Sequence, residues 1–476
     1  MWAIVEKVVQ KLPTIKKPKY LTNLDRLKWS AIAVILYLLL SYTPLIGVSQ
    51  TGAGVFEELV VLLGASFGSI VSLGIGPIII GYLLAELFIG SGELNIDITT
   101  EEGKRKFENL ARFFMIVFGL FESIVMATIG WFKPSQFLIS LFAMPFSFLG
   151  SNAFLIGYIL AVLFIVAQLM LGVILAYLLD DLSQKWGFTS GINLFILATV
   201  SRELFVQLFN PLTQIPGTPT PPIGKIPQIF YFISQGLYTE AIVVGLQLLV
   251  IVLVILLSVY FYMVKIPIPT SFGKIPEKSL RYEVRLIYTG NIPVIFAFAF
   301  LHQILLIAWV LQQLGIPLLG TIENGHPING LVAYIYPDTG FLISLILGNL
   351  TLDNLIRTIT SSLFFLGSSI LFSIYFVLAT GQDSEGLAKQ LSKMFGRIGL
   401  KRDYRIIKHY LDKIIPCVTV LGGFIVGFLA LLSYWVSIPI GGTSILLATM
   451  ISYMVYEQLK ETGILKELTQ IISKLE

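Results

Sequence analysis

The stretch from Leu73 to Gly92, LGIGPIIIGYLLAELFIGSG, is the part of the sequence that decides the fold. It is long and apolar enough to cross a membrane, yet it opens with Gly74, Gly76 and Pro77. A helix that faces lipid gains nothing from these residues, because proline removes a backbone donor and glycine weakens a helix. A helix that begins within the bilayer, beside protein or water, tolerates them. The stretch therefore predicts a half-helix that lines a pore.

Composition places the chain among helical membrane proteins. Its 476 residues are 56% hydrophobic and 13% charged, whereas soluble proteins carry about 25% charged residues. Apolar runs of about twenty residues recur and do not alternate, which favours spanning helices over a β-barrel. We expect an all-α polytopic protein with one membrane domain. The ten expected spans are residues 28–46, 72–92, 109–131, 154–179, 189–208, 239–263, 291–313, 356–380, 414–435 and 438–457.

Basic residues predict the orientation of these spans. With the N-terminus inside, 28 of the 32 Lys and Arg residues fall on the inner side. The run Leu331–Leu350 is apolar enough to be an eleventh span, but crossing there would put basic loops on opposite sides. We therefore expect it to be an external re-entrant or surface-packed segment. Five spans precede and five follow the proline-rich external segment 210–228, which permits an inverted repeat.

Two shorter segments have helical character outside the spans. The N-terminus lacks a cleavable signal, and its apolar residues from Trp2 to Leu12 fall on one face, which predicts a short interfacial helix. The run Val55–Leu63 is too short to cross the membrane and carries Glu57 and Glu58. It fits a short helix inside an external funnel, and the alternative is an amphipathic loop.

Charged residues within spans are costly and therefore informative. They are Glu86, Glu122, Arg202, Glu203, Glu240 and Arg357. All except Glu122 lie near span ends or in their outer parts. Glu122 lies mid-span and should face protein or water. It serves either proton or ion coupling or a structural hydrogen bond to another span, and no second acidic residue at helical spacing supports a relay.

The inner loops 264–290 and 381–413 together carry thirteen basic residues. The positive-inside rule alone explains a few of them. Eight in one loop also suggest a docking surface for a phosphate-rich or acidic partner, such as a ribosome.

The sequence predicts neither an enzyme nor a bound cofactor. It contains no Walker loop, dinucleotide fingerprint, GxSxG or HExxH motif. The three histidines, His302, His326 and His409, are far apart, so we expect no metal site. The single cysteine, Cys417, cannot form an internal disulfide. Any driving force for transport must then come from a partner.

Four motifs resemble those of the SecY family, the large subunit of the protein-conducting channel. They are LGIGPIIIGYLLAELFIGSG, WGFTSGINLFI, GNIPVI and GGTSILLA, in order along the chain. The basic stretch GLKRDYRIIKHYLDKIIPCVTVLGG resembles the corresponding loop of archaeal members. The resemblance implies two pseudo-symmetric inverted halves, spans 1–5 and 6–10, around a central hourglass pore. The halves would be residues 1–208 and 209–476.

The resemblance also assigns residues to the waist and to the gate of such a pore. The waist ring would be Ile75, Ile79, Ile192, Ile196, Ile295 and Leu447. A plug at about residues 52–67 would close the pore from outside. A lateral gate would open to lipid between spans 2 and 3 and spans 7 and 8. Its polar cluster maps to Glu122, Gln303 and Ile80, where Ile80 departs from the hydroxylated residue that the family often has.

The function implied is a passive channel that secretes unfolded polypeptides and inserts membrane proteins into the cytoplasmic membrane. Implied partners are a SecE-type subunit, a small β-type subunit, signal peptides, nascent chains, membrane lipid and a ribosome. Candidate docking residues are Lys274, Lys278, Arg281, Arg285, Arg397, Lys401, Arg402 and Arg405. Lys401 stands where the family has a prominent arginine, so Arg402 or Arg397 takes that role. The alternative function is an inverted-repeat secondary transporter, which requires polar groups at mid-membrane; an intramembrane enzyme is a more distant third.

Overall fold

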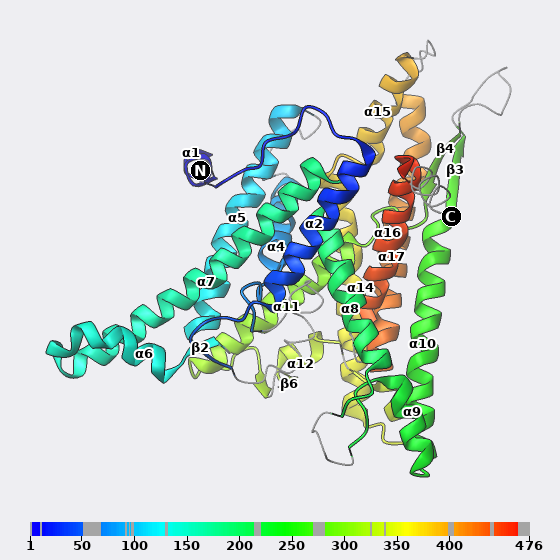
Figure 1. Cartoon of the computed structure of the whole chain (residues 1–476). Helices are drawn as coiled ribbons and strands as arrows, with labels where there is room; N and C mark the ends of the chain where they lie inside the picture. Colours follow the sequence, from blue (N-terminus) through cyan, green and yellow to red (C-terminus); the bar gives the residue numbers. More distant parts are fainter. Residues whose placement is uncertain are drawn as a thin grey trace, which may run out of the picture.

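The computed structural model describes most of the chain as a bundle of long helices (Figure 1). The described residues are 2–9, 12–50, 68–90, 93–94, 96, 100–128, 132–213, 220–269, 281–323, 326–337, 339–397, 404–437 and 442–464. The expected helix at 55–63 and the expected plug at 52–67 lie outside them.

Each of the ten expected spans coincides with a helix. These helices are α2 (Asn23–Tyr42), α4 (Gly76–Gly90), α5 (Glu101–Thr128), α7 (Ser151–Trp186), α8 (Gly191–Phe209), α10 (Tyr238–Met263), α11 (Ile292–Gln313), α14 (Leu352–Ala379), α16 (Tyr404–Trp435) and α17 (Gly442–Glu461). By length and composition, seven of the helices in the described part are able to cross a membrane, and α2, α4 and α17 are not among them. The 15 residues of α4 reach only about 23 Å, less than the ~30 Å hydrocarbon core, so α4 is a half-helix as its sequence predicts.

The helices pack as two groups that meet along a seam. In one group α4 packs on α5, and α2 packs on α7 and α8. In the other, α14 packs on α16 and α11, and α10 packs on α17. Contacts of α4 with α11 and α14, and of α8 with α17, join the groups. The seam thus runs between helices of the first and second halves of the sequence.

Small and hydroxylated residues bring α14 and α16 together. Ser369 Oγ donates to Gly423 O at 2.8 Å, and Ser373 Oγ donates to Thr419 O at 2.8 Å. Helices in lipid gain little from apolar burial against each other, so close backbone approach and interhelical hydrogen bonds hold such pairs together.

The start of the chain is tied to the ends of α4, α5 and α7. Helix α1 (Trp2–Val9) buries Val5 and Val9 in a cluster with residues of α4 and α5. The following segment is clamped to α7: Ile15 N donates to Asp181 Oδ2 at 2.8 Å, and Lys185 Nζ donates to Ile15 O at 2.7 Å. The expected N-terminal helix is confirmed, and Val5 and Val9 of its apolar face pack on protein.

The all-α expectation misses three short antiparallel strand pairs. They are β1 (Val48–Gln50) with β2 (Phe132–Pro134), β3 (Lys265–Pro269) with β4 (Arg281–Arg285), and β5 (Thr321–Glu323) with β6 (His326–Asn329). All three are hairpins or bridges in connections, where the 3.6-residue period carries no signal. They leave the helical class of the fold unchanged.

Several connections contain helices of their own. The run 331–350 forms the short helices α12 (Leu331–Ile335) and α13 (Phe341–Ile346), so it does not span, as expected. Helix α9 (Lys225–Ser234) begins inside the proline-rich segment 210–228, whose prolines favour an extended chain. Helix α6 (Gln136–Ala143) and the 3₁₀ helix η1 (Met144–Leu149) precede α7, and α15 (Ser384–Arg397) precedes α16.

The connections gather at two opposite ends of the bundle. Figure 1 shows α1, α15 and the β3–β4 pair at one end, and α6, α9, α12 and β6 towards the other. The first end holds the segments that the sequence places inside.

Candidate functional site

The half-helix α4 begins in the interior of the bundle. Gly74 has a positive φ of 55°, a conformation that residues with a Cβ rarely adopt. Turn hydrogen bonds from Gly74 N to Val71 O and from Gly76 N to Leu73 O, at 2.8 and 3.2 Å, then lead into the helix. Pro77 is its second residue, where the missing donor costs nothing. The glycines and proline of the opening motif thus build the start of α4.

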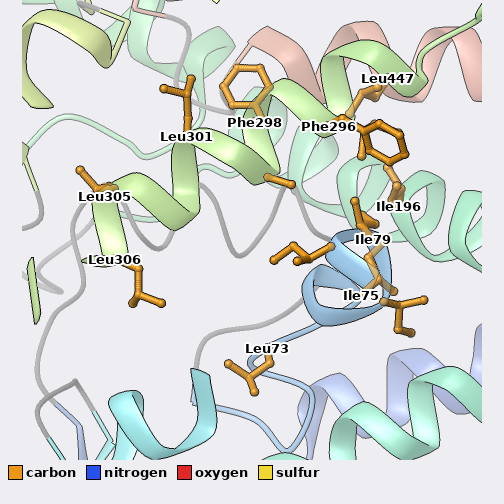
Figure 2. Close-up of a cluster of buried hydrophobic side chains, with 14 of the residues drawn as sticks. Leu73, Ile75, Ile79, Ile196, Phe296, Phe298, Leu301, Leu305, Leu306 and Leu447 are labelled. Carbon is orange, nitrogen blue, oxygen red and sulfur yellow. The ribbon is translucent and has the colours of Figure 1, made fainter. Parts of the chain in front are cut away.

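The six predicted ring residues come from four elements and all belong to, or pack against, the continuous apolar core of the bundle. They are Ile75 and Ile79 at the start of α4, Ile192 and Ile196 on α8, Ile295 on α11 and Leu447 on α17. Five are buried, with exposed fractions from 0% for Ile75 to 8% for Ile295, and Ile192 is half-buried. Figure 2 shows Ile75, Ile79, Ile196 and Leu447 within this cluster. The four labelled residues come from α4, α8 and α17 or the residue just before α4, so both halves of the sequence contribute aliphatic side chains to this part of the core.

The same core contains aromatic residues, and one of them lies directly beside a predicted ring residue. Phe296, one position after Ile295 on α11, is 6% exposed and belongs to the same cluster (Figure 2). Its ring makes an edge contact with Phe372 on α14, with centroids 6.2 Å apart. The motif NIPVIF contains both Ile295 and Phe296, but the sequence alone does not show that both side chains are buried.

An aliphatic constriction suits a seal for water and ions. Its side chains offer no hydrogen bonds, so a narrow passage among them dewets. The same lack of directional bonds lets the side chains move apart around a passing chain and close again. The six ring side chains themselves carry no group that could hold a small polar solute.

A polar pair crosses the seam between α5 and α11. Gln303 Nε2 donates a hydrogen bond to Glu122 Oε1, and Glu122 is only 2% exposed. The structure therefore gives Glu122 a hydrogen bond to another span, the second of the two roles considered for it. Gln303 Oε1 is buried without a hydrogen-bond partner among the described residues. Ile80 is 3% exposed within the apolar cluster and adds no polar group.

The other charged residues of the spans have simpler surroundings. Arg357 pairs with Asp353 at 2.7 Å, and Arg202 lies over the ring of Tyr42 at 5.3 Å. Glu86 is 7% exposed, and its Oε2 has no hydrogen-bond partner in the described part of the chain.

Only part of the predicted docking set lies among the described residues. Lys274, Lys278, Lys401 and Arg402 lie outside them, and Arg281 and Arg397 are placed only on β4 and α15. Arg405 is exposed at the start of α16. Arg285 binds within the chain: its guanidinium donates to Glu457 and to Tyr262 Oη, the latter at 2.7 Å.

Helices α15 and α16 are joined by Glu385 of α15, which binds Lys389 of its own helix and Lys408 of α16. Glu385 accepts from Lys389 and from Lys408, at 2.8 and 2.9 Å. Hydrogen bonds from both lysines lower the pKa of the Glu385 carboxyl to about 2. No group of three or more His, Cys, Asp and Glu side chains in the described part could hold a metal ion.

Comparisons with known proteins agree with this class, a polytopic helical channel with a plug. The family model described as SecY matches residues 69–456, and the one described as the plug domain of Sec61p matches residues 35–68. The chain belongs to the SecY family.

Curated relatives match over nearly the full length. The protein translocase subunit SecY of Methanothermobacter thermautotrophicus is 33% identical, over 96% of this chain and 95% of its own. The subunit of Pyrococcus furiosus is 33% identical, over 94% and 93%.

Solved structures give the same result. A structure described as a protein conducting channel has a TM-score of 0.77 at 26% identity and covers 96% of both chains. Sec61 in a canine ribosome–channel complex has a TM-score of 0.75 at 26% identity and also covers 96% of both chains.

Proposed function

We propose that the chain is the pore-forming subunit of a protein translocase. It provides a passive channel for secretion of unfolded polypeptides and for lateral insertion of membrane proteins. The observation that carries the proposal is the aliphatic cluster at the start of the half-helix α4. In a channel for chains of every sequence, the seal must close on water and ions without binding any one side chain, and aliphatic groups meet that requirement.

We infer that the constriction consists of Ile75, Ile79, Ile192, Ile196, Ile295 and Leu447, with Phe296 beside them. Residues 1–208 and 209–476 are the two halves around it, and about 52–67 form the plug that closes it from outside. The match of residues 35–68 to a plug-domain family model supports this assignment. The contacts of α4 with α11 and α14, and of α8 with α17, support a pore between the halves.

The lateral gate is the seam of α4 and α5 with α11 and α14. A hydrophobic segment that separates these helices exchanges their contacts for its own and enters lipid by apolar burial. The Glu122–Gln303 hydrogen bond crosses this seam and adds a polar contact that opening must break. A hydrophobic segment can therefore leave the pore sideways into lipid through the seam, whereas the constriction leads only across the membrane.

The chain lies in the cytoplasmic membrane with both termini on the cytoplasmic side. The distribution of basic residues supports this orientation. A ribosome docks on the loops 264–290 and 381–413, through Lys274, Lys278, Arg281, Arg397, Lys401, Arg402 and Arg405. The canine relative was solved in a ribosome–channel complex, which supports this partner. We assign Arg285 a structural role because Glu457 and Tyr262 already bind it. A SecE-type and a small β-type subunit complete the complex.

Conductance in planar bilayers tests the constriction. We expect the wild type to be closed to ions and the double variant Ile79→Gly with Ile196→Gly to leak. The matched control is Ile165→Gly with Ile251→Gly, which removes two buried isoleucines from α7 and α10, outside the ring. Equal leakage of both variants, or a folded but silent ring variant, would show that the ring is wrongly assigned. A silent ring variant that takes up small solutes in proteoliposomes would favour the transporter instead.

A further inference from the structure

The hairpin of α6, η1 and the first turns of α7 extends away from the other helices of the bundle. In Figure 1 it lies at the far left, beyond β2. The hairpin is closely packed within itself. A Cβ on Gly157 of α7 would come within 2.8 Å of the Ala143 Cβ at the end of α6. Phe142 and Phe164 bring the two arms together with ring centroids 5.7 Å apart. It is therefore a built element, and its position is fixed by its own contacts.

Both arms of the hairpin present large apolar side chains away from the protein. On the α6 and η1 side, Phe137, Met144 and Phe148 are 74%, 74% and 78% exposed. On α7, Phe154 and Leu155 are 58% and 59% exposed. A soluble surface would scatter such residues singly among charged ones. The exposed described residues of the projection are mostly apolar, and the polar ones, Gln136, Ser140, Ser147 and Asn152, carry no charge.

The hairpin also lacks the charges that a water-exposed element carries. No charged residue or histidine occurs in the 46 residues between Lys133 and Asp180. Two uncharged polar side chains of this charge-free stretch bind within the chain: Ser140 Oγ donates to Phe137 O at 2.9 Å, and farther along α7 the Gln168 amide binds both backbone groups of Ile46. Backbone and hydroxyl groups with such internal partners tolerate hydrocarbon.

Helix α7 links the hairpin to the membrane-facing surface of the bundle. Its 36 residues extend about 54 Å, far more than the ~30 Å hydrocarbon core. The exposed apolar face continues along α7 from the hairpin through Ile159 and Leu163 to Leu171. A single solvent therefore contacts the hairpin and the spanning part of α7.

We propose that this hairpin is an anchor immersed in the acyl chains of the lipid bilayer, in the leaflet opposite α15. The proposed orientation makes this the outer leaflet. The hairpin extends the lipid-contacting surface of the first half beyond the helix bundle and holds the end of α7 within the membrane. A second copy of the chain is the competing occupant, and the experiment below separates the two.

Fluorescence quenching by lipid tests the anchor in nanodiscs that hold one copy each. A nitrobenzoxadiazole label is placed at Phe148→Cys or Met144→Cys in a Cys417→Ser background. The lipids carry bromine on their acyl chains. Leu256→Cys on α10, 65% exposed, is the lipid-facing control, and Tyr20→Cys, 96% exposed, is the water-facing control. All four positions are exposed, so the label leaves the core intact.

We expect quenching at Phe148 and Met144 equal to that at Leu256 and severalfold above that at Tyr20. Labelling by a membrane-impermeant maleimide should be correspondingly slow at the two hairpin sites. Quenching at the level of Tyr20, with fast labelling, would overturn the proposal. So would hairpin sites that are protected only when two copies share a disc, which would identify a second copy as the occupant. Both sides of a nanodisc are open, so the result does not depend on the orientation or on channel activity.

Discussion

Two helical glycines differ in what surrounds them, and this difference predicts opposite effects of adding a methyl group. A Cβ on Gly172 of α7 would collide with the backbone carbonyl of Ile70, just before α4, whereas Gly245 of α10 has open space. We expect Gly172→Ala to destabilise the protein by about 1–3 kcal/mol, because backbone must shift. Gly245→Ala should be neutral or stabilise by up to about 1 kcal/mol. Thermal unfolding in detergent measures both. Equal melting temperatures would contradict the close approach of α7 to the segment before α4.

The hydrogen bond between Glu122 and Gln303 also predicts a stability change. Glu122→Leu removes the acceptor and leaves a buried amide donor unsatisfied, which costs about 1–3 kcal/mol. Glu122→Gln can still accept and should cost less. Adding Gln303→Leu to Glu122→Leu should recover part of the loss, because both polar groups are then gone. Strict additivity of the two leucine variants, measured by thermal unfolding, would mean that the pair is not coupled. If the seam is the gate, Glu122→Leu should also increase insertion of weakly hydrophobic segments.

At the residue scale, the sequence predicts that the aliphatic ring residues are buried, but it does not predict the aromatic residue beside them. The family motifs place Ile79 and Leu447 in one buried cluster because their helices begin at defined Gly and Pro residues. The burial of Phe296 is not predicted, because Phe296 follows Ile295 directly and the motif does not show how far α11 is rotated about its axis. The polar pair is also found, since an acidic residue in mid-span requires a partner.

At the element scale, the link between α15 and α16 predicts a pH dependence. The pKa of Glu385 lies at about 2 in the folded protein, below its ordinary value of 4.5. A carboxyl with a lowered pKa contributes stability above its ordinary value and loses it as the pH falls towards the folded value. Docking of α15 on α16 should therefore weaken between pH 4.5 and about 2. Hydrogen exchange of α15, corrected for intrinsic rates, measures this. In Glu385→Gln the profile should be flat over the same window. A wild-type profile as flat as that of the variant would show that the contacts of Glu385 with the lysines do not hold α15 on α16. High salt should reduce the pH dependence, because the charged groups are exposed.

The positions of the spans are predictable from the sequence because membrane thickness sets the length of an apolar run. The helices of the connections are not. The α6–α7 hairpin is as apolar as a span, so hydropathy alone cannot separate its first arm from a crossing segment. Helix α9 starts at Lys225 within a proline-rich segment, and the prolines of that segment favour an extended conformation over a helix. The β3–β4 pair is not predictable from the helical period of apolar residues, because short strands in a connection do not follow that period.

At the scale of the whole molecule, the seam between the halves predicts that a covalent link will stop transport. Gly90 of α4 lies close to Tyr375 of α14, since a Cβ on Gly90 would be 3.8 Å from the Tyr375 Cα. This spacing suits a disulfide between Gly90→Cys and Tyr375→Cys in a Cys417→Ser background. We expect the oxidised pair to block membrane insertion, and reductant to restore it. The matched control is Ser369→Cys with Gly427→Cys, which links α14 to α16 within one half and should leave insertion intact. Insertion that persists in the oxidised Gly90–Tyr375 pair would place the gate elsewhere.

The aliphatic composition of the proposed constriction has a thermal consequence. A seal formed by apolar side chains depends on the reluctance of water to wet them, and that free energy carries a large heat-capacity change and weakens on cooling. A seal made of ion pairs would respond mainly to salt. The closed state of this channel should therefore be tightest when warm and least tight when cold. An organism that cools its membrane changes the barrier to ion leakage through the empty channel, with no change in the protein itself.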